Sequence, residues 1–381
     1  MAKDIIKLGD VATYINGYAF KPEDRGEEGL QIIRIQDLTG NSYDLGFYNG
    51  KYPKKIEIND GDVLISWSAS LGVYVWNGGK ALLNQHIFKV KFDKVDIDKS
   101  YFVYAVRYKL NDMGKKTHGA TMKHIVKRDF DATEIPYPPL KKQIEIAINL
   151  DKVLMVIKER KRELKLLDEL IKARFVEMFG TLDTPTQAFE KATLKELCNK
   201  ITDGKHGGCK SEVGTERYFV GAREIYDDDV HYESAPEINI EEFEKDYKRC
   251  NVEIGDFLIV NTGATIGKSA IACDKRTEHT LLQKSVALLK VKKDVLNPIF
   301  LKWCYRVNTK MYMVENASAQ PNLLLSKINA TVIYVPDIEL QNQFADFVHQ
   351  VDKSKLNKIA ARWPAKAVTQ FFFSENVKLF L

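Results

Sequence analysis

IEINDGDVLISWSASLGVYVW, residues 56–76, decides the fold, because the chain contains a second version of it, NVEIGDFLIVNTGATIGKSAIA, at residues 251–272. The two stretches align so that Gly61 and Asp62 match Gly255 and Asp256. In both, apolar runs lie on either side of a glycine-containing turn, which predicts a strand, a turn and a second strand. We therefore interpret the stretch as one structural unit that the chain uses twice.

The repeat extends far beyond these two stretches. Four more segments match their counterparts in the second half: LGDVATYING (8–17) with LKELCNKITDG (194–204), LLNQHIFKVK (82–91) with LLQKSVALLKVK (281–292), YFVYAVRYKL (101–110) with IFLKWCYRVN (299–308), and GATMKHIVKRDFDATEIPYPPLKKQI (119–144) with SAQPNLLLSKINATVIYVPDIELQNQF (318–344). The predicted fold class is α/β (mixed α+β), with two similar globular domains related by an internal pseudo-twofold repeat.

The segment GATIGKS (263–269) is close to a phosphate-binding loop but does not match one. A Walker A loop is G-x-x-x-x-G-K-[ST], followed by a helix whose N-terminus faces the phosphates. Here Gly263 is one residue too close to Gly267, and the residues after Ser269 favour a strand. The first copy has Val73 where the second has Lys268. We interpret the segment as a glycine turn that carries Lys268, and not as a nucleotide site.

Each half ends in a proline-marked strand followed by a helix start that contains a glutamine, Gln143 or Gln341. No glycine or proline occurs from residue 141 to 179, and Gly180 then ends the helix. From Leu150 to Met178, apolar positions follow heptad spacing with two polar interruptions. The predicted organisation is a first globular domain (1–139), a central helix (140–180), a second globular domain (181–337), a short distal helix (338–360) and an atypical tail (361–381).

Composition excludes several classes of protein. The net charge of +5 suits nucleic acid if the basic residues cluster. Five cysteines without a C-x-x-C motif favour neither a disulfide framework nor a zinc site. The N-terminus lacks a signal-peptide core and no window is apolar enough to span a membrane, so a cytoplasmic protein is expected. The chain also lacks the [ND]-P-P-[FYW] loop of an amino-methyltransferase, so we expect partners to carry any catalysis.

The chain resembles the DNA-specificity subunit of type I restriction-modification enzymes over about residues 5 to 355, most specifically in GATMKHIVKRDFDATEIPYPPLKKQ and GDVLISWSASLGVYVW. The resemblance implies two target-recognition domains, each reading half of a split target in double-stranded DNA, separated by long antiparallel coiled-coil helices. It also implies two methyltransferase (modification) subunits and nuclease/translocase (restriction) subunits as partners. No cofactor is expected on this chain, whereas S-adenosylmethionine, ATP and Mg²⁺ are implied for the partners. Lys142 departs from the family pattern, which has glutamate there.

Candidate DNA-binding residues follow from the repeat and from charge. A basic cluster before the central helix is expected to neutralise phosphates, and the matching segment of the second half is less charged, which favours two different half-sites. Polar residues at aligned positions are candidates for base contacts. The candidates are Arg34, Gln36, Ser66, Ser68, Asn84, Gln85, His86, Lys115, Lys116, Lys123, His124, Lys127 and Arg128 in the first half, and Lys205, His206, Arg223, Lys268, Gln283, Gln320 and Asn322 in the second. Trp67 and Trp76 are expected to be core aromatics.

Three alternatives remain open at this point. A nucleotide-hydrolysing enzyme built on GATIGKS would bind nucleotide as an isolated chain. A coiled-coil scaffold that does not bind DNA would lack salt-dependent affinity for a duplex. A specificity subunit of a related type II-like methyltransferase/nuclease complex would share the architecture but assemble with other partners.

Overall fold

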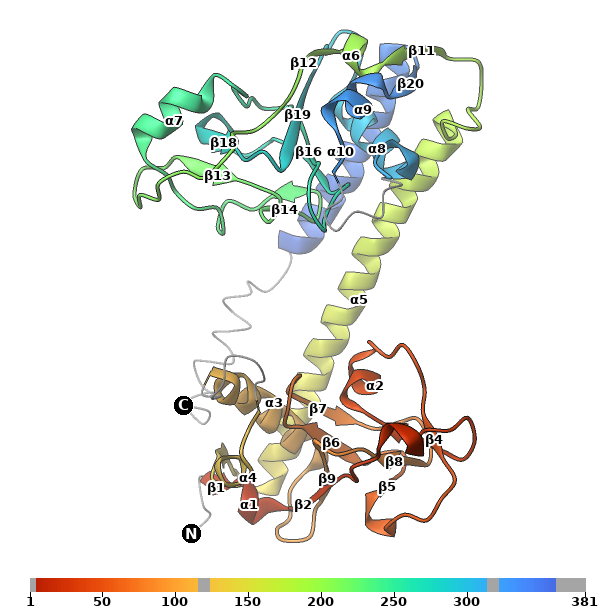
Figure 1. Cartoon of the computed structure of the whole chain (residues 1–381), viewed down its shortest axis with the longest axis vertical. Helices are drawn as coiled ribbons and strands as arrows, with labels where there is room; N and C mark the ends of the chain where they lie inside the picture. Colours follow the sequence, from red (N-terminus) through yellow and green to blue (C-terminus); the bar gives the residue numbers. More distant parts are fainter. Residues whose placement is uncertain (1–4, 116–123, 314–321, 361–381) are drawn as a thin grey trace. The chain divides into compact units, whose positions relative to one another are not determined.

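The computed structural model describes residues 5–115, 124–313 and 322–360 (Figure 1). It consists of two compact units, unit 1 up to Arg160 and unit 2 from Lys161 to Arg362, and one helix, α5 (Leu140–Phe179), continues from the first into the second. The predicted tail, residues 361–381, lies outside the described residues. Within those ranges no helix combines the length and apolar character needed to span a membrane.

Unit 1 contains short helices and strands, and the described strands form two four-stranded sheets and one two-stranded sheet. Its strands are β1 (Ile5–Lys7), β2 (Thr13–Asn16), β3 (Leu30–Ile33), β4 (Phe47–Tyr48), β5 (Glu57–Ile58), β6 (Val63–Ser66), β7 (Gly72–Val75), β8 (Ala81–Leu83), β9 (Ile87–Lys91) and β10 (Glu134–Pro136). Its helices before α5 are α1 (Leu8–Val11), α2 (Ile35–Thr39), α3 (Lys99–Lys115) and α4 (Lys127–Asp131).

Unit 2 repeats this order except in the middle. Its strands are β11 (Glu190–Thr193), β12 (Cys198–Asp203), β13 (Tyr218–Val220), β14 (Ile225–Tyr226), β15 (Asp229–Val230), β16 (Phe257–Val260), β17 (Ser269–Ile271), β18 (Thr280–Leu282), β19 (Val286–Val291) and β20 (Val332–Val335). Its helices are α6 (Leu194–Leu197), α7 (Ile240–Tyr247), α8 (Pro298–Val307), α9 (Leu325–Ala330) and α10 (Ile338–Ala360). In the middle of unit 2, α7 follows two strands (β14 and β15), whereas α2 of unit 1 comes before β4.

The strand pairing confirms the internal repeat. The main sheets have the orders β2-β9-β6-β7 and β12-β19-β16-β17, which are equivalent strand for strand. The pair β1–β10 corresponds to β11–β20, and the parallel pair β3–β8 corresponds to β13–β18. One difference is that β4 and β5 extend the β3–β8 pair of unit 1 to a four-stranded sheet.

The two stretches that reveal the repeat are antiparallel hairpins, β6–β7 and β16–β17. Gly61 and Gly255 have φ values of 85° and 96°, a conformation that glycine adopts without strain. Asp62 accepts a hydrogen bond from the backbone N–H of Asn59, and Asp256 accepts one from Glu253, both at 2.8 Å. The turn that contains Lys268 therefore connects two strands, as predicted, and no helix follows it as in a phosphate-binding loop.

The two predicted helix-start glutamines attach the long helices to their domains. Gln143 is buried, and its side chain accepts from the N–H of Asp98 (2.9 Å) and donates to the carbonyl of Pro138 (2.8 Å). Gln341 is fully buried, and its side chain accepts from the N–H of Asn297 (2.9 Å). It also donates to the carbonyls of Pro336 (2.7 Å) and Val295 (3.0 Å). Each glutamine thus satisfies backbone groups that burial would otherwise leave unpaired.

Helices α5 and α10 match the predicted ranges, and their pairing in unit 2 is antiparallel (Figure 1). The Phe344 ring lies 5.3 Å from that of Phe175, whereas the later Lys355 forms a 2.7 Å ion pair with the earlier Asp168. The predicted heptad seam is buried toward its end, at Ile171 and Phe175, but Leu154 and Ile157 are 43% and 41% exposed. Among the described residues, the predicted seam is therefore buried where α10 packs against it and exposed in its earlier part.

Candidate nucleic-acid interface

Backbone hydrogen bonds bring four segments of each unit together around the turn that connects β8 to β9 in unit 1 or β18 to β19 in unit 2. In unit 1 the donors and acceptors are Asn84 N to Ile33 O (3.0 Å), Gln85 N to Tyr18 O (2.8 Å), Trp67 N to His86 O (3.2 Å) and Ile125 N to Trp67 O (2.9 Å). In unit 2 they are Gln283 N to Val220 O (2.8 Å), Lys284 N to Lys205 O (2.9 Å), Asn261 N to Ser285 O (3.0 Å) and Leu323 N to Asn261 O (2.7 Å). We call each set of segments the turn framework.

The two turn frameworks share further local features. The backbone N–H of Arg34 donates to Asp37 (2.7 Å), as that of Gly221 donates to Glu224 (2.8 Å). Gly17 and Gly204 allow the closest approach of two chain segments, because a Cβ atom there would lie 2.0 Å or 2.1 Å from a backbone oxygen. The same main-chain arrangement is thus built twice from different sequences.

The frameworks hold different side chains at equivalent positions. The equivalent pairs are Gln36 and Arg223, Trp67 and Asn261, Ser68 and Thr262, Asn84 and Gln283, Gln85 and Lys284, His86 and Ser285, and His124 and Asn322. Gln85, His124, Arg223 and Lys284 are exposed. Because these bonds are made by the backbone, such side chains remain available to an incoming molecule.

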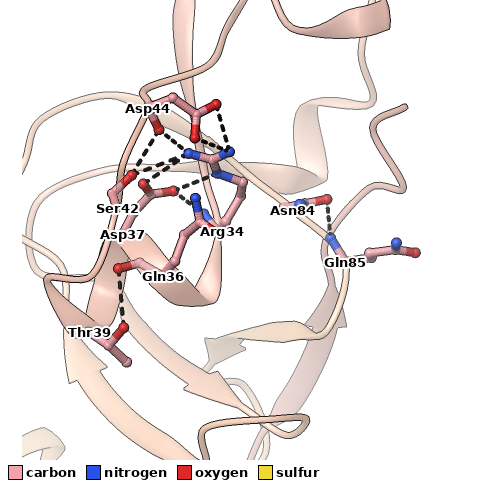
Figure 2. Close-up of polar contacts among 8 residues, drawn as sticks. All are labelled: Arg34, Gln36, Asp37, Thr39, Ser42, Asp44, Asn84 and Gln85. Carbon is pink, nitrogen blue, oxygen red and sulfur yellow. Dashed lines mark hydrogen bonds and ion pairs between the residues drawn. The ribbon is translucent and has the colours of Figure 1, made fainter. Parts of the chain in front are cut away.

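Three sequence-predicted residues lie inside unit 1. Arg34 is 7% exposed, and its guanidinium donates to Asp37 (Nε to Oδ2, 3.1 Å), to Ser42 and to Asp44 (Figure 2). Although burial opposes it, the hydrogen bonds to Asp37 and Asp44 raise the pKa of Arg34. Ser66 is fully buried and Ser68 is 5% exposed. These three side chains support the domain and are not part of the solvent-facing surface.

The neighbouring polar candidates form the rim of the framework. Gln36 is partly exposed. In the amide orientation that satisfies hydrogen bonding, its side-chain oxygen accepts from Arg34 Nη2 at 3.0 Å, which leaves its amide nitrogen to donate elsewhere. Asn84 accepts from the N–H of Gln85 (2.8 Å), as Figure 2 shows. His86 has a φ of 70° and packs against Trp67, with 4.9 Å between ring centroids. Trp67 itself packs on the core through Phe88 but is partly exposed.

The basic cluster of unit 1 is only partly free to meet phosphates. Lys127 Nζ lies 2.6 Å from Asp131, whereas the side chain of Arg128 is 90% exposed and 3.4 Å from Asp129. Lys115 ends α3, but its side chain lies outside the described residues, as do Lys116 and Lys123 in full.

The candidates of unit 2 also divide into engaged and solvent-facing residues. Lys205 Nζ lies 2.7 Å from Asp246 of α7, a hydrogen bond that raises the pKa of Lys205 although burial opposes it. His206 is exposed and 3.4 Å from Asp203. Asn322 accepts from Thr262 (3.2 Å), and Gln320 lies outside the described residues.

Two exposed lysines have no ion-pair partner within the part of the chain that the structure describes. Lys268 lies at the β16–β17 turn, where Gly267 packs against the ring of Tyr312. Lys284 lies in the β18–β19 turn, at the position of Gln85. The sequence reasoning missed Lys284, although the aligned segments LLNQ and LLQK already match it to Gln85.

The described side chains suit recognition better than metal chemistry. Over residues 5–115, 124–313 and 322–360, no group of three or more His, Cys, Asp or Glu residues is arranged to hold a metal ion. Amide, imidazole and cationic side chains on a rigid backbone framework can instead donate to phosphates and to the edges of bases.

Comparisons with known proteins agree with the twofold construction. The model of the type I restriction modification DNA specificity domain matches residues 3–166 and again residues 187–362. The specificity subunit of the type I restriction enzyme EcoBI of Escherichia coli is 25% identical, covering 91% of this chain and 78% of that protein. The EcoKI specificity subunit of E. coli K12 is 20% identical, covering 91% and 81%. A structure from a study of assembly and conformational transition of the type I restriction-modification system covers 97% and 94% at 15% identity, with a TM-score of 0.52.

Proposed function

The chain belongs to the family of type I restriction-modification DNA specificity subunits, and from that membership we propose how its two units divide the recognition of DNA. Unit 1 reads one half of a bipartite duplex sequence and unit 2 reads the other, each through the side chains of its turn framework. The single observation that carries this proposal is that one main-chain arrangement presents two different sets of side chains.

The chemistry of the equivalent positions supports different half-sites. Arg223 is exposed and suits bidentate donation to guanine, whereas Gln36 offers the amide nitrogen that Arg34 leaves free. Lys268, Lys284 and Arg128 are placed to neutralise phosphates, which position the duplex without reading its sequence.

The long helices set the distance between the two half-sites and dock the partner subunits. The corresponding division of the chain is 1–139 and 181–337 for the target-recognition domains, 140–180 and 338–360 for the helices. Specificity subunits of type I systems are themselves non-catalytic. In the cytoplasmic complex, two methyltransferase subunits and the nuclease/translocase subunits carry the reactions that use S-adenosylmethionine, ATP and Mg²⁺.

A domain exchange tests the division of labour. Replacing residues 1–139 with the equivalent region of a relative should change one half of the methylated target, mapped by methylome sequencing, and leave the other half intact. A simultaneous change in both halves would refute the assignment of one half-site to each unit.

Point variants test the framework itself. Gln36→Ala and Arg223→Ala should each relax selectivity in one half-site only, by roughly 5- to 150-fold against the wrong base for a direct contact. Thermal melting checks that each variant remains folded. If duplex binding by the assembled complex showed no dependence on salt, the chain would be a scaffold rather than a DNA reader.

A further inference from the structure

The loop between α2 and β4 of unit 1 exposes large apolar side chains next to the turn framework. Tyr43 is 99% exposed and Leu45 is 58% exposed. A single exposed apolar residue needs no explanation by itself. Tyr43 differs from such a residue because hydrogen bonds fix the loop that carries it.

A buried arginine fixes the loop on both sides of Tyr43. Arg34 donates to the hydroxyl of Ser42 (3.3 Å) and to the backbone carbonyl of Asp44 (Figure 2). The hydroxyl of Ser42 also donates to the carbonyl of Asp44 (2.8 Å). Gly40 ends α2 in the left-handed conformation, at a φ of 73°. Because its neighbours are bonded to the domain, the backbone at Tyr43 is held in place while the side chain extends into solvent.

Unit 2 lacks this device at the equivalent place. Gly221 occupies the position of Arg34, and the short β14–β15 hairpin follows in place of the loop. The tyrosine of that hairpin, Tyr226, stacks on His231 with 3.4 Å between ring centroids and 3° between ring planes. The two segments thus each carry a tyrosine, which stacks on a histidine ring in unit 2 and is exposed in unit 1.

We propose that Tyr43 is a DNA-contacting residue of unit 1, and that Arg34 is its positioning residue. The inference rests on the proposed function. The ring packs against apolar atoms of the duplex, thymine methyl groups and deoxyribose edges, beside the base pairs that Gln36 and Gln85 reach. DNA is favoured as the partner because α2 carries Gln36 and leads directly into the loop, so both side chains belong to one rigid segment.

Duplex binding by the full chain assembled with its methyltransferase subunits tests the proposal. The probe is a duplex that carries the target mapped by methylome sequencing. Tyr43→Ala should weaken its binding about tenfold, the size of one good base-edge contact. Tyr43→Phe should bind like the unchanged protein, because the ring makes the contact. Val75→Ala is the matched control, since Val75 is 51% exposed at the end of β7 away from the framework.

The positioning role has its own readout. Arg34→Met should lower affinity at least as much as Tyr43→Ala, because Arg34 also holds the Gln36 amide. The double variant with Tyr43→Ala should bind no more weakly than Arg34→Met, because the Tyr43 contact is already lost in that single variant. Additive losses would mean that Arg34 supports the fold without acting through Tyr43.

The outcomes separate this inference from the proposed function. If Tyr43→Ala binds normally while Gln36→Ala loses selectivity, the Tyr43 contact is refuted and the two-reader proposal stands. If Gln36→Ala and the domain exchange are also without effect, the proposed function itself fails. If the Tyr43→Ala variant keeps its DNA affinity but no longer assembles with the methyltransferase subunits, the loop is a protein-docking site and the DNA contact is refuted.

Discussion

Replacing Gln341 with alanine should destabilise unit 2 selectively. The fully buried side chain satisfies three backbone groups, the N–H of Asn297 and the carbonyls of Pro336 and Val295. A buried polar group left without a partner costs roughly 1 kcal/mol or more, so the change should lower the free energy of unfolding by about 3 kcal/mol. For a domain of this size, that loss corresponds to a decrease of about 6–12 °C in the melting temperature.

The matched variants make this expectation specific. Gln143 satisfies two backbone groups rather than three, so Gln143→Ala should cost about 2 kcal/mol, and in unit 1 instead. Gln343→Ala, at an exposed position of the same helix as Gln341, is the control and should change little. Gln341→Glu retains an acceptor for Asn297 but loses the donor, so it should also be destabilising.

Calorimetry of the full chain provides the assay, because each unit has its own core and should give its own transition. Gln341→Ala should lower the melting temperature of the unit 2 transition, and Gln143→Ala should lower that of the unit 1 transition. The reasoning is refuted if Gln341→Ala melts like Gln343→Ala, or if both transitions fall together in each variant.

Three further predictions concern charge and length. Lys268→Ala should weaken duplex binding and reduce the dependence of log affinity on log salt by about one unit, with no change in ATP binding by this chain; a loss of ATP affinity would instead support a nucleotide loop. The hydrogen bond from Arg276 lowers the pKa of Asp274 to about 2, although burial opposes this shift. The ionised carboxylate therefore stabilises unit 2 at every pH above the unfolded pKa of about 4, and this stabilisation is lost as the pH falls toward 2. Arg276→Met should raise that pKa and remove the stabilisation, measured by acid unfolding; identical acid unfolding of both proteins would contradict this. A seven-residue insertion near Arg162, matched in α10, should lengthen the spacer by about three base pairs and preserve both half-sites; altered bases with an unchanged spacer would exclude a helical ruler.

The backbone plan could be predicted from the sequence because local signals determine it. Glycine at 61 and 255 requires a turn, the absence of glycine and proline from 141 to 179 permits one long helix, and Gly180, with a φ of 74°, ends it. The repeat then carries each assignment from one half to the other. The helix-start glutamines were also visible in the sequence, although their bonds to distant backbone groups, such as the N–H groups of Asp98 and Asn297, were not.

The candidate interface was less predictable because burial depends on contacts between segments far apart in the chain. From the sequence, Arg34 is a candidate for base contacts. In the structure it pairs with Asp44, ten positions later, and is buried. Lys205 is likewise a candidate for DNA binding, but in the structure it pairs with Asp246 of α7. Leu154 fits a heptad seam by spacing alone, yet its burial depends on how far α10 extends.

The turn framework also has a consequence for how such a protein changes over generations. Main-chain atoms form its bonds, so exposed residues such as Gln85, Arg223 and Lys284 can be exchanged at little cost in folding stability. In the proposed function these residues read the target, so single substitutions would change the recognised sequence while the domain continues to fold. Each unit has its own framework, so each half of the target would change independently, and a few variants of each half would combine into many different targets.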